Sequence, residues 1–146
     1  MRVLIVGATG FLGDALLPLV PSSWEVVATG CRRAPARGGR LLDLTDPFAL
    51  PSLLLEFAPD AVLFLAYDRK ALDETVVRPA AQLADWSQKR FERRLIYVST
   101  DLVFSGGAQE YDEDAPQSPL MPYGAAKATA ENHIGAWGAV VRTSLL

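Results

Sequence analysis

The feature that most constrains the fold of this chain is a regular alternation of short apolar runs with longer stretches of helical periodicity. Five apolar runs rich in β-branched residues predict strands, and a weaker run adds a sixth. Strands that alternate with helices form parallel sheets covered on both faces, which explains why the runs are continuously apolar. We therefore expect an α/β fold, a doubly wound parallel sheet of about six strands, at Val3–Val6, Glu25–Ala28, Arg40–Leu42, Ala61–Ala66, Leu95–Val98 and Ala139–Val141.

Helical periodicity fills the connections between these strands. Pro79 interrupts the third stretch, and because proline removes a backbone donor we expect either a kink or a second helical segment beginning there. A chain of 146 residues has about the length of one domain. The expected helices lie at Phe11–Leu17, Pro47–Phe57, Leu72–Lys89 and Tyr123–Trp137.

Composition excludes several classes of protein. Half of the residues are apolar, 21% are charged and the net charge is −3, which argues against a disordered chain and a strongly basic nucleic-acid binder. The longest apolar run, Ala61–Tyr67, is far shorter than the ~20 residues that cross a bilayer, and the N-terminus does not resemble a signal peptide. The single Cys31 and single His133 cannot assemble a metal cluster. We expect a cytoplasmic chain with no metal and with neither nucleic acid nor membrane as a partner.

Three glycines follow the first expected strand at the spacing G-x-x-G-x-x-G and open the first expected helix. Gly7 permits the tight turn, Gly10 lets a pyrophosphate approach the backbone, and Gly13 lets the helix pack closely on the strand. The helix N-terminus adds free N–H groups for the anion. A purely structural turn is the simpler alternative. We predict a dinucleotide-binding domain of the Rossmann type over residues 1–146, with cofactor contacts from Gly7, Thr9, Gly10, Phe11, Leu12 and Gly13.

The end of the second strand bears on the choice between NAD and NADP. An acidic residue there would hold the ribose 2′-hydroxyl of NAD, whereas arginine accepts the 2′-phosphate of NADP. Here Arg32 and Arg33 follow the strand and no carboxylate does, so we expect NADP in preference to NAD; a solvated basic loop is the alternative. Asp43 and Leu44 are placed to contact the adenine edge, although a role at the entry to the next helix would also explain them.

A tyrosine and a lysine four residues apart suggest proton-transfer chemistry. Tyr123 and Lys127 share one face of an expected helix, where the cation is expected to lower the pKa of the phenol and so tune it as a general acid. The spacing alone is common by chance. Ser99 and Thr100, at the carboxyl end of the fifth strand, strengthen the assignment because either hydroxyl is placed to bond a substrate carbonyl.

In combination these segments resemble the extended short-chain dehydrogenase/reductases, and within them the dTDP-4-dehydrorhamnose reductase group. The resemblance implies that Thr100, Tyr123 and Lys127 form the catalytic trio, with Tyr123 protonating the oxygen while hydride passes from NADPH to the 4-keto carbon of a nucleotide sugar. It further implies that Lys127 contacts the nicotinamide ribose and that Leu65, Ala66, Tyr67 and Ser99 line the cofactor. The matching segments are Gly7–Gly13, Asp43–Asp46, Ser99–Gly106, Tyr111–Pro119 and Pro122–Lys127 with Glu131.

The chain departs from this family in two places. Thr75–Pro79 lacks an asparagine that the family commonly carries before the fifth strand, and the family's substrate region would follow the sixth strand, where this chain ends. We therefore expect the C-terminal substrate region to be absent from this chain. An unpaired edge at Ala139–Val141 then predicts a homo-oligomer, with NADPH still bound and turnover undetectable or far below that of a full-length relative.

Three functions stay open. The first is an NADP-dependent reductase of a keto sugar nucleotide, supported by the complete trio. The second is a non-catalytic NADP-binding regulatory subunit, favoured by the missing substrate region. The third is a nucleotide-sugar epimerase or dehydratase that retains NAD, which Arg32 and Arg33 disfavour.

Overall fold

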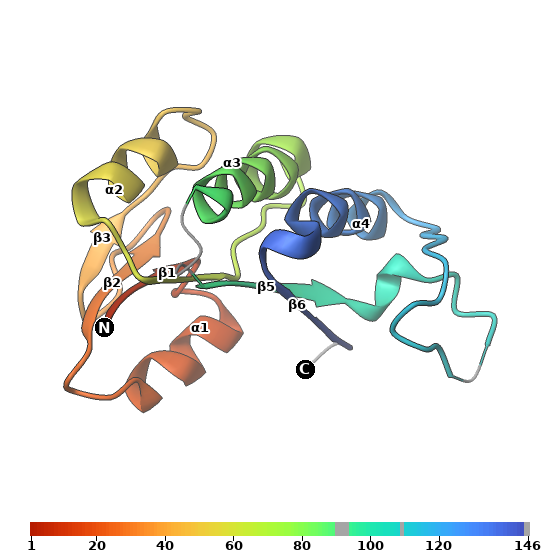
Figure 1. Cartoon of the computed structure of the whole chain (residues 1–146), viewed down its shortest axis with the longest axis horizontal. Helices are drawn as coiled ribbons and strands as arrows, with labels where there is room; N and C mark the ends of the chain where they lie inside the picture. Colours follow the sequence, from red (N-terminus) through yellow and green to blue (C-terminus); the bar gives the residue numbers. More distant parts are fainter. Residues whose placement is uncertain (90–93, 109, 145–146) are drawn as a thin grey trace.

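A single parallel sheet of six strands organises the molecule (Figure 1). The computed structural model of the chain describes residues 1–89, 94–108 and 110–144. The strand order is β3-β2-β1-β4-β5-β6 and every pairing is parallel, so the predicted doubly wound α/β sheet is confirmed. The strands are β1 (Arg2–Val6), β2 (Glu25–Gly30), β3 (Gly39–Leu41), β4 (Ala61–Phe64), β5 (Arg94–Thr100) and β6 (Ala139–Thr143).

The chain direction across the sheet reverses at β1. This strand pairs with β2 on one side and with β4 on the other, so that Val3 lies between Val26 and Ala61. Connections that leave β1 in opposite directions diverge at the carboxyl ends of the strands and open a crevice there. The fold therefore places a binding crevice beside the end of β1, where the glycine loop begins.

The helices cover the two faces of the sheet unequally. In Figure 1, α2, α3 and α4 lie on one face, and α1 lies on the other beneath β1 and β2. The helical segments are α1 (Phe11–Leu16), η1 (Leu17–Leu19), α2 (Ala49–Phe57), η2 (Asp73–Val77), α3 (Arg78–Gln88), η3 (Asp101–Val103), α4 (Pro122–Ile134) and η4 (Gly135–Trp137). Among the described residues, none of these helices is long and apolar enough to cross a membrane.

The third predicted helix is two segments. A π-helical turn, η2, ends at Val77, and α3 begins at Arg78 with Pro79 in its first turn. Proline is tolerated there because the first amides of a helix have no partner within the helix. The second of our two expectations for Pro79 is therefore the one observed.

Two apolar clusters hold the layers together. The larger joins the sheet to α2, α3 and α4 and includes Leu4, Phe64, Leu83 and Ile134, which have no exposed surface. Burying a side chain of this size contributes about 2 kcal/mol. The smaller cluster, between the sheet and α1, includes Val3, Ile5, Ala8, Leu17 and Ala28. These two clusters fix the strand ends that carry the site.

One apolar strip of the sheet has little cover among the described residues. Ile96, on β5, is 40% exposed, and Val141, on β6, is 48% exposed. The alternation of exposed and buried residues along β5 shows that only one face of this strand is packed. Exposed apolar surface of this kind favours association, but the predicted homo-oligomer stays a prediction.

Candidate active site

A cleft of about 280 Å³ opens at the carboxyl ends of the strands. The glycine loop forms one wall, and the ends of β4, β5 and β6 together with the start of α4 form the rest. Eleven of the residues that the sequence singled out line it: Gly7, Gly10, Phe11, Leu12, Gly13, Leu65, Tyr67, Ser99, Thr100, Tyr123 and Lys127. Six others are not among its lining residues: Thr9, Arg32, Arg33, Asp43, Leu44 and Ala66.

The three glycines of the loop differ in what the fold requires of them. Gly7 has a φ of +91°, and a Cβ placed on it would lie 2.6 Å from the backbone nitrogen of Ala66. A Cβ on Gly13 would lie 2.5 Å from the Cα of Ala8. At Gly10 the nearest atom to such a Cβ is the Gly7 carbonyl oxygen, at 3.6 Å, an ordinary contact. The fold thus needs Gly7 and Gly13, whereas the space at Gly10 is free for a ligand.

Lys127 is buried and points at the fifth strand. Its side chain is only 2% exposed, and Nζ donates a hydrogen bond to the Val98 carbonyl oxygen at 2.8 Å. The same nitrogen lies 4.6 Å from the centre of the Tyr97 ring. Burial lowers the pKa of Lys127 to about 8, although the charge of Glu131 opposes this change. Lys127 is therefore a cation near neutral pH that loses its proton more readily than an exposed lysine.

Tyr123 lines the cleft, and its ring is tilted against that of Tyr67. The two ring centres are 5.2 Å apart, and the guanidinium carbon of Arg69 lies 5.6 Å from the Tyr123 ring centre. Burial raises the pKa of Tyr123, with Tyr67 and Asp101 adding to the rise, while Arg69 opposes it. Lys127 is not among the causes of this shift, and our expectation that it lowers this pKa stays a prediction. Lys127 Nζ lies 5.9 Å from the ring centre and bonds Val98 instead.

Two hydroxyls lie beside this tyrosine at the end of β5. Thr100 Oγ1 donates to the Asp101 carboxylate at 3.1 Å and accepts from the Leu102 amide at 3.2 Å. Ser99 Oγ is buried and has no hydrogen-bond partner within the described part of the chain. An unsatisfied buried hydroxyl that borders a cleft is suited to bonding a ligand.

The arginines after β2 lie next to the glycine loop. The Arg33 guanidinium donates to Asp14 at 2.8 Å and to the Thr9 carbonyl oxygen at 3.4 Å, so Arg33 and Thr9 are in contact although neither lines the cleft. Arg32 is exposed. A ligand that extends past the glycine loop towards β2 would meet this positive charge.

Local contacts already explain much of the segment after β3. The Asp43 carboxylate accepts hydrogen bonds from the amide and the hydroxyl of Thr45, and these bonds lower the pKa of Asp43. Leu44 is buried in the large apolar cluster. These contacts are those of a turn leading into α2, and a contact with adenine stays a prediction for both residues.

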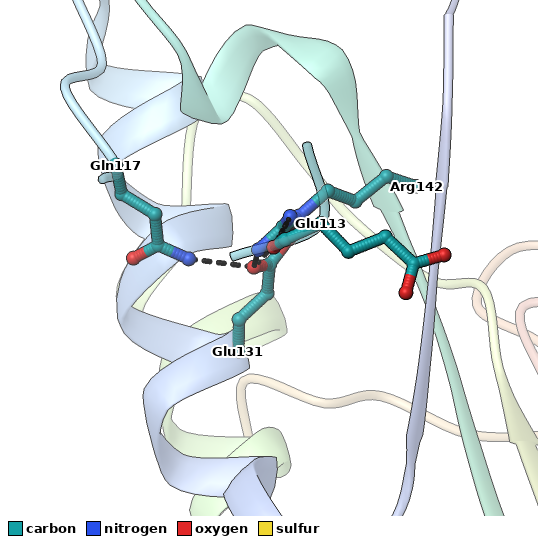
Figure 2. Close-up of polar contacts among 4 residues, drawn as sticks. All are labelled: Glu113, Gln117, Glu131 and Arg142. Carbon is teal, nitrogen blue, oxygen red and sulfur yellow. Dashed lines mark hydrogen bonds and ion pairs between the residues drawn. The ribbon is translucent and has the colours of Figure 1, made fainter. Parts of the chain in front are cut away.

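A buried ion pair ties the long loop after β5 to α4 and β6. Arg142 donates to both carboxylate oxygens of Glu131, the shortest distance being 2.7 Å, and Gln117 reaches the same carboxylate from the opposite side at 2.6 Å (Figure 2). Arg142 also donates to the Glu113 carbonyl oxygen at 2.8 Å. The network fastens the loop beside the cleft and sets the position of Thr143, the neighbour of Arg142, which lines it.

All of residues 1–146 match the RmlD substrate binding domain family. The chain belongs to that family. Methionine adenosyltransferase 2 subunit beta of Rattus norvegicus is 35% identical over 159 residues, which cover 99% of this chain and 47% of that protein. The chain thus spans about half the length of the curated relatives it matches.

Solved structures of dTDP-4-dehydrorhamnose reductases superpose on this RmlD-family chain. A hypothetical member from Sulfolobus tokodaii gives a TM-score of 0.89 at 27% identity, covering 99% of this chain and 56% of that one. The Bacillus anthracis enzyme in complex with NADP gives 0.80 at 30% identity, with 98% and 53% covered. The resemblance inferred from the sequence motifs is confirmed.

Some cleft residues of the RmlD-family chain were not assigned to the site from the sequence. Thr143 and Ser144 enter the cleft because β6 ends there, and Val98 and Leu102 flank the two predicted hydroxyl residues. Arg69 follows Tyr67 by two residues in the loop after β4. A cation in a loop at the carboxyl edge of the sheet was the available signal for Arg69, since such loops line the crevice of this fold.

Replacing Lys127 with methionine is expected to stabilise the RmlD-family chain at pH 7. The pKa of this lysine falls from near 10.5 to about 8 on folding, so the unfolded chain binds more protons between these values and stability rises with pH across that window. Below pH 8 the burial cost is present in full, about 3 kcal/mol, and the lost Val98 hydrogen bond offsets ~1 kcal/mol.

Thermal unfolding measures this balance. The midpoint of the methionine variant should lie roughly 5 °C above that of the wild type at pH 7, and the gap should close towards pH 10.5. A variant that is less stable than the wild type at pH 7 would contradict the burial argument. A gap that does not change with pH would contradict the assignment of the titration to Lys127.

Proposed function

We propose that this chain carries the cofactor-binding and proton-transfer half of an NADP-dependent reductase that acts on a keto sugar nucleotide. One observation carries the proposal: Thr100, Tyr123 and Lys127 line the same cleft as the glycine loop. The similarity to dTDP-4-dehydrorhamnose reductases over nearly the whole chain supports it.

The residues present in the cleft fit a dinucleotide. The open space at Gly10 suits a pyrophosphate close to the backbone, and the first turn of α1 offers amides that lack partners within the helix. Ser99 supplies a buried hydroxyl with no partner among the described residues, and Leu65 and Tyr67 supply an apolar wall. When bound, NADPH would supply a hydride to the carbonyl carbon and become NADP⁺.

Three side chains would then complete the reduction of the ketone to an alcohol. Tyr123 donates the proton of its hydroxyl to the carbonyl oxygen, which carries the electron pair of the former double bond. Thr100 hydrogen-bonds the same oxygen and orients it. Lys127, charged below about pH 8, stabilises the negative charge that develops at the cleft and contacts the cofactor ribose.

The preference for NADPH over NADH rests on the two arginines that follow β2. Arg33 already contacts the glycine loop through the Thr9 carbonyl oxygen, and Arg32 is exposed beside it. A 2′-phosphate would add a partner for guanidinium groups where a 2′-hydroxyl would not. The absence of a carboxylate at this position also makes an NAD-retaining epimerase or dehydratase a poorer fit.

Fluorescence titration tests this preference. NADPH should bind about tenfold more tightly than NADH, a difference of ~1.4 kcal/mol. Changing Arg32 and Arg33 together to glutamine should remove most of that difference, whereas Arg94→Gln, at the far end of β5, should leave it intact. Equal affinities of the wild type for the two cofactors, or tighter binding of NADH, would overturn the preference.

A second function is favoured by one specific observation. Relatives at 33–35% identity are named as a subunit of another enzyme, the beta subunit of methionine adenosyltransferase 2. A chain with that role would bind the dinucleotide in the same cleft without transferring hydride. Cofactor binding alone therefore supports both functions, and hydride transfer separates them.

A further inference from the structure

Two cations approach the ring of Tyr123 from different elements. Lys127 is one turn further along α4, and its Nζ is 5.9 Å from the ring centre. Arg69 belongs to the loop after β4, and its guanidinium carbon is 5.6 Å from the same centre. The sequence pattern points to Lys127 alone, because the two residues share a helix face.

The ammonium group of Lys127 contacts β5 more closely than it contacts the ring of Tyr123. Nζ donates to the Val98 carbonyl oxygen at 2.8 Å and lies closer to the Tyr97 ring, at 4.6 Å, than to Tyr123. A carbonyl oxygen carries partial negative charge, so this contact satisfies part of the ammonium group within the sheet. The ammonium group of Lys127 is therefore held against β5.

Arg69 is differently placed. Arg69 is exposed and lines the cleft, and within the described part of the chain it has no ion-pair partner. The nearby Asp68 carboxylate accepts from the Lys70 amide, so the neighbouring acid is used within its own loop. Because this guanidinium has no ion-pair partner among the described residues, its positive charge acts on the nearby, half-buried phenol of Tyr123 with little compensation by other charges.

The other charged or titratable groups that face Tyr123 do not replace Arg69. Tyr67 and Tyr97 both lie close enough to interact with Tyr123, and a phenol carries no positive charge. Asp101 is an anion whose carboxylate accepts the hydroxyl of Thr100, and its charge disfavours the phenolate. Besides Lys127, Arg69 is thus the cation near enough to favour the phenolate of Tyr123.

We propose that Arg69 is a positioning residue for the reaction proposed above, which places positive charge on the open side of Tyr123 and so makes its phenol a better proton donor. The proposal rests on the proposed function for its catalytic meaning, but the electrostatic part concerns this chain alone. Arg69 lowers the pKa of Tyr123 against the effect of burial, which agrees with the geometry. The proton-transfer group thereby depends on a loop that follows a different strand.

The test is a titration of Tyr123 in the whole chain without cofactor. Incorporating 3-fluorotyrosine makes each phenol visible by fluorine NMR and lowers phenol pKa values, which keeps the titration within the range where the chain is folded. The signal of Tyr123 is the one absent from the Tyr123→Phe variant. Arg69→Gln should raise the pKa of this phenol by about half a pH unit to one pH unit.

Three comparisons separate charge from structure. Arg69→Lys should keep most of the wild-type pKa, and Lys70→Gln, which removes the adjacent exposed cation, should leave it unchanged. Raising salt to about 1 M should shrink the difference between wild type and Arg69→Gln, because the Debye length falls to ~3 Å. A Tyr123 pKa that is unchanged or lower in Arg69→Gln would overturn the proposal.

The outcome does not depend on reductase activity. If no hydride transfer is found but Arg69→Gln still raises the Tyr123 pKa, the reductase proposal fails while the electrostatic pairing stands. If transfer is found and the pKa does not move, Arg69 has no part in tuning the phenol. Arg69→Gln is expected to fold, since the side chain is exposed.

Discussion

Replacing Tyr123 with phenylalanine is expected to slow hydride transfer by about 10²–10⁴-fold while leaving NADPH affinity nearly unchanged. In the proposed reaction the hydroxyl donates the proton, whereas the ring contributes to packing. Phenylalanine keeps the ring whose centre lies 5.2 Å from that of Tyr67, so the wall of the cleft persists. The rate is measured at saturating cofactor, as transfer of deuterium from 4-deuterated NADPH to the substrate.

A control on the same helix keeps this result specific. Thr129 is exposed on α4, and its hydroxyl donates to the Ala125 carbonyl oxygen of its own helix, so Thr129→Ala should transfer at the wild-type rate. Equal rates for wild type and Tyr123→Phe would mean that another group delivers the proton. Thr100, Tyr123 and Lys127 would then line the same cleft without acting together as a catalytic trio.

Gly10→Val should weaken NADPH binding by about 100-fold, or ~2.7 kcal/mol, without lowering the stability of the fold. A Cβ at Gly10 meets only the Gly7 carbonyl oxygen, at 3.6 Å. The backbone there is extended, with φ −80° and ψ 172°, which suits a β-branched residue. The valine side chain would therefore fill the space that a pyrophosphate needs and nothing else. Titration of NADPH and thermal unfolding of the same sample measure the two effects.

Gly13→Val is the matched comparison from the same loop. Its Cβ would lie 2.5 Å from the Cα of Ala8, so this variant should lose stability as well as binding. The pair separates a glycine required by the fold from one required by the ligand. Wild-type affinity in Gly10→Val would show that the loop does not approach a pyrophosphate at this position.

The parts of the fold that could be predicted from the sequence depend on local pattern. The continuously apolar run at Ala61–Phe64 indicates a strand covered on both faces, and the glycine spacing after Val6 indicates a turn and a helix start. The run was expected to continue to Ala66, but β4 ends at Phe64, and beyond it the backbone of Ala66 lies close to Gly7. That contact lies between segments that are distant in sequence.

The same distinction applies to the site. Tyr123 and Lys127 are four residues apart on one helix, so their proximity follows from helical geometry. The contacts of Lys127 with Val98 and of Arg142 with Glu131 join a helix to strands, and no local pattern specifies them. Glu131 lies one further turn along α4 from Lys127, and its partner on β6 became apparent only with the sheet in place.

Hydride transfer by this chain is measured most directly with deuterium. The whole chain is incubated with 4-deuterated NADPH and dTDP-4-dehydrorhamnose, and the nucleotide sugar is analysed by mass spectrometry. Deuterium accumulates over a long incubation, so this method detects transfer that is too slow for a steady-state assay. We expect deuterium on the former carbonyl carbon, and we expect its incorporation to depend on Tyr123. Bound NADPH with no deuterium in the sugar would contradict it and would assign the chain to a non-catalytic, cofactor-binding role.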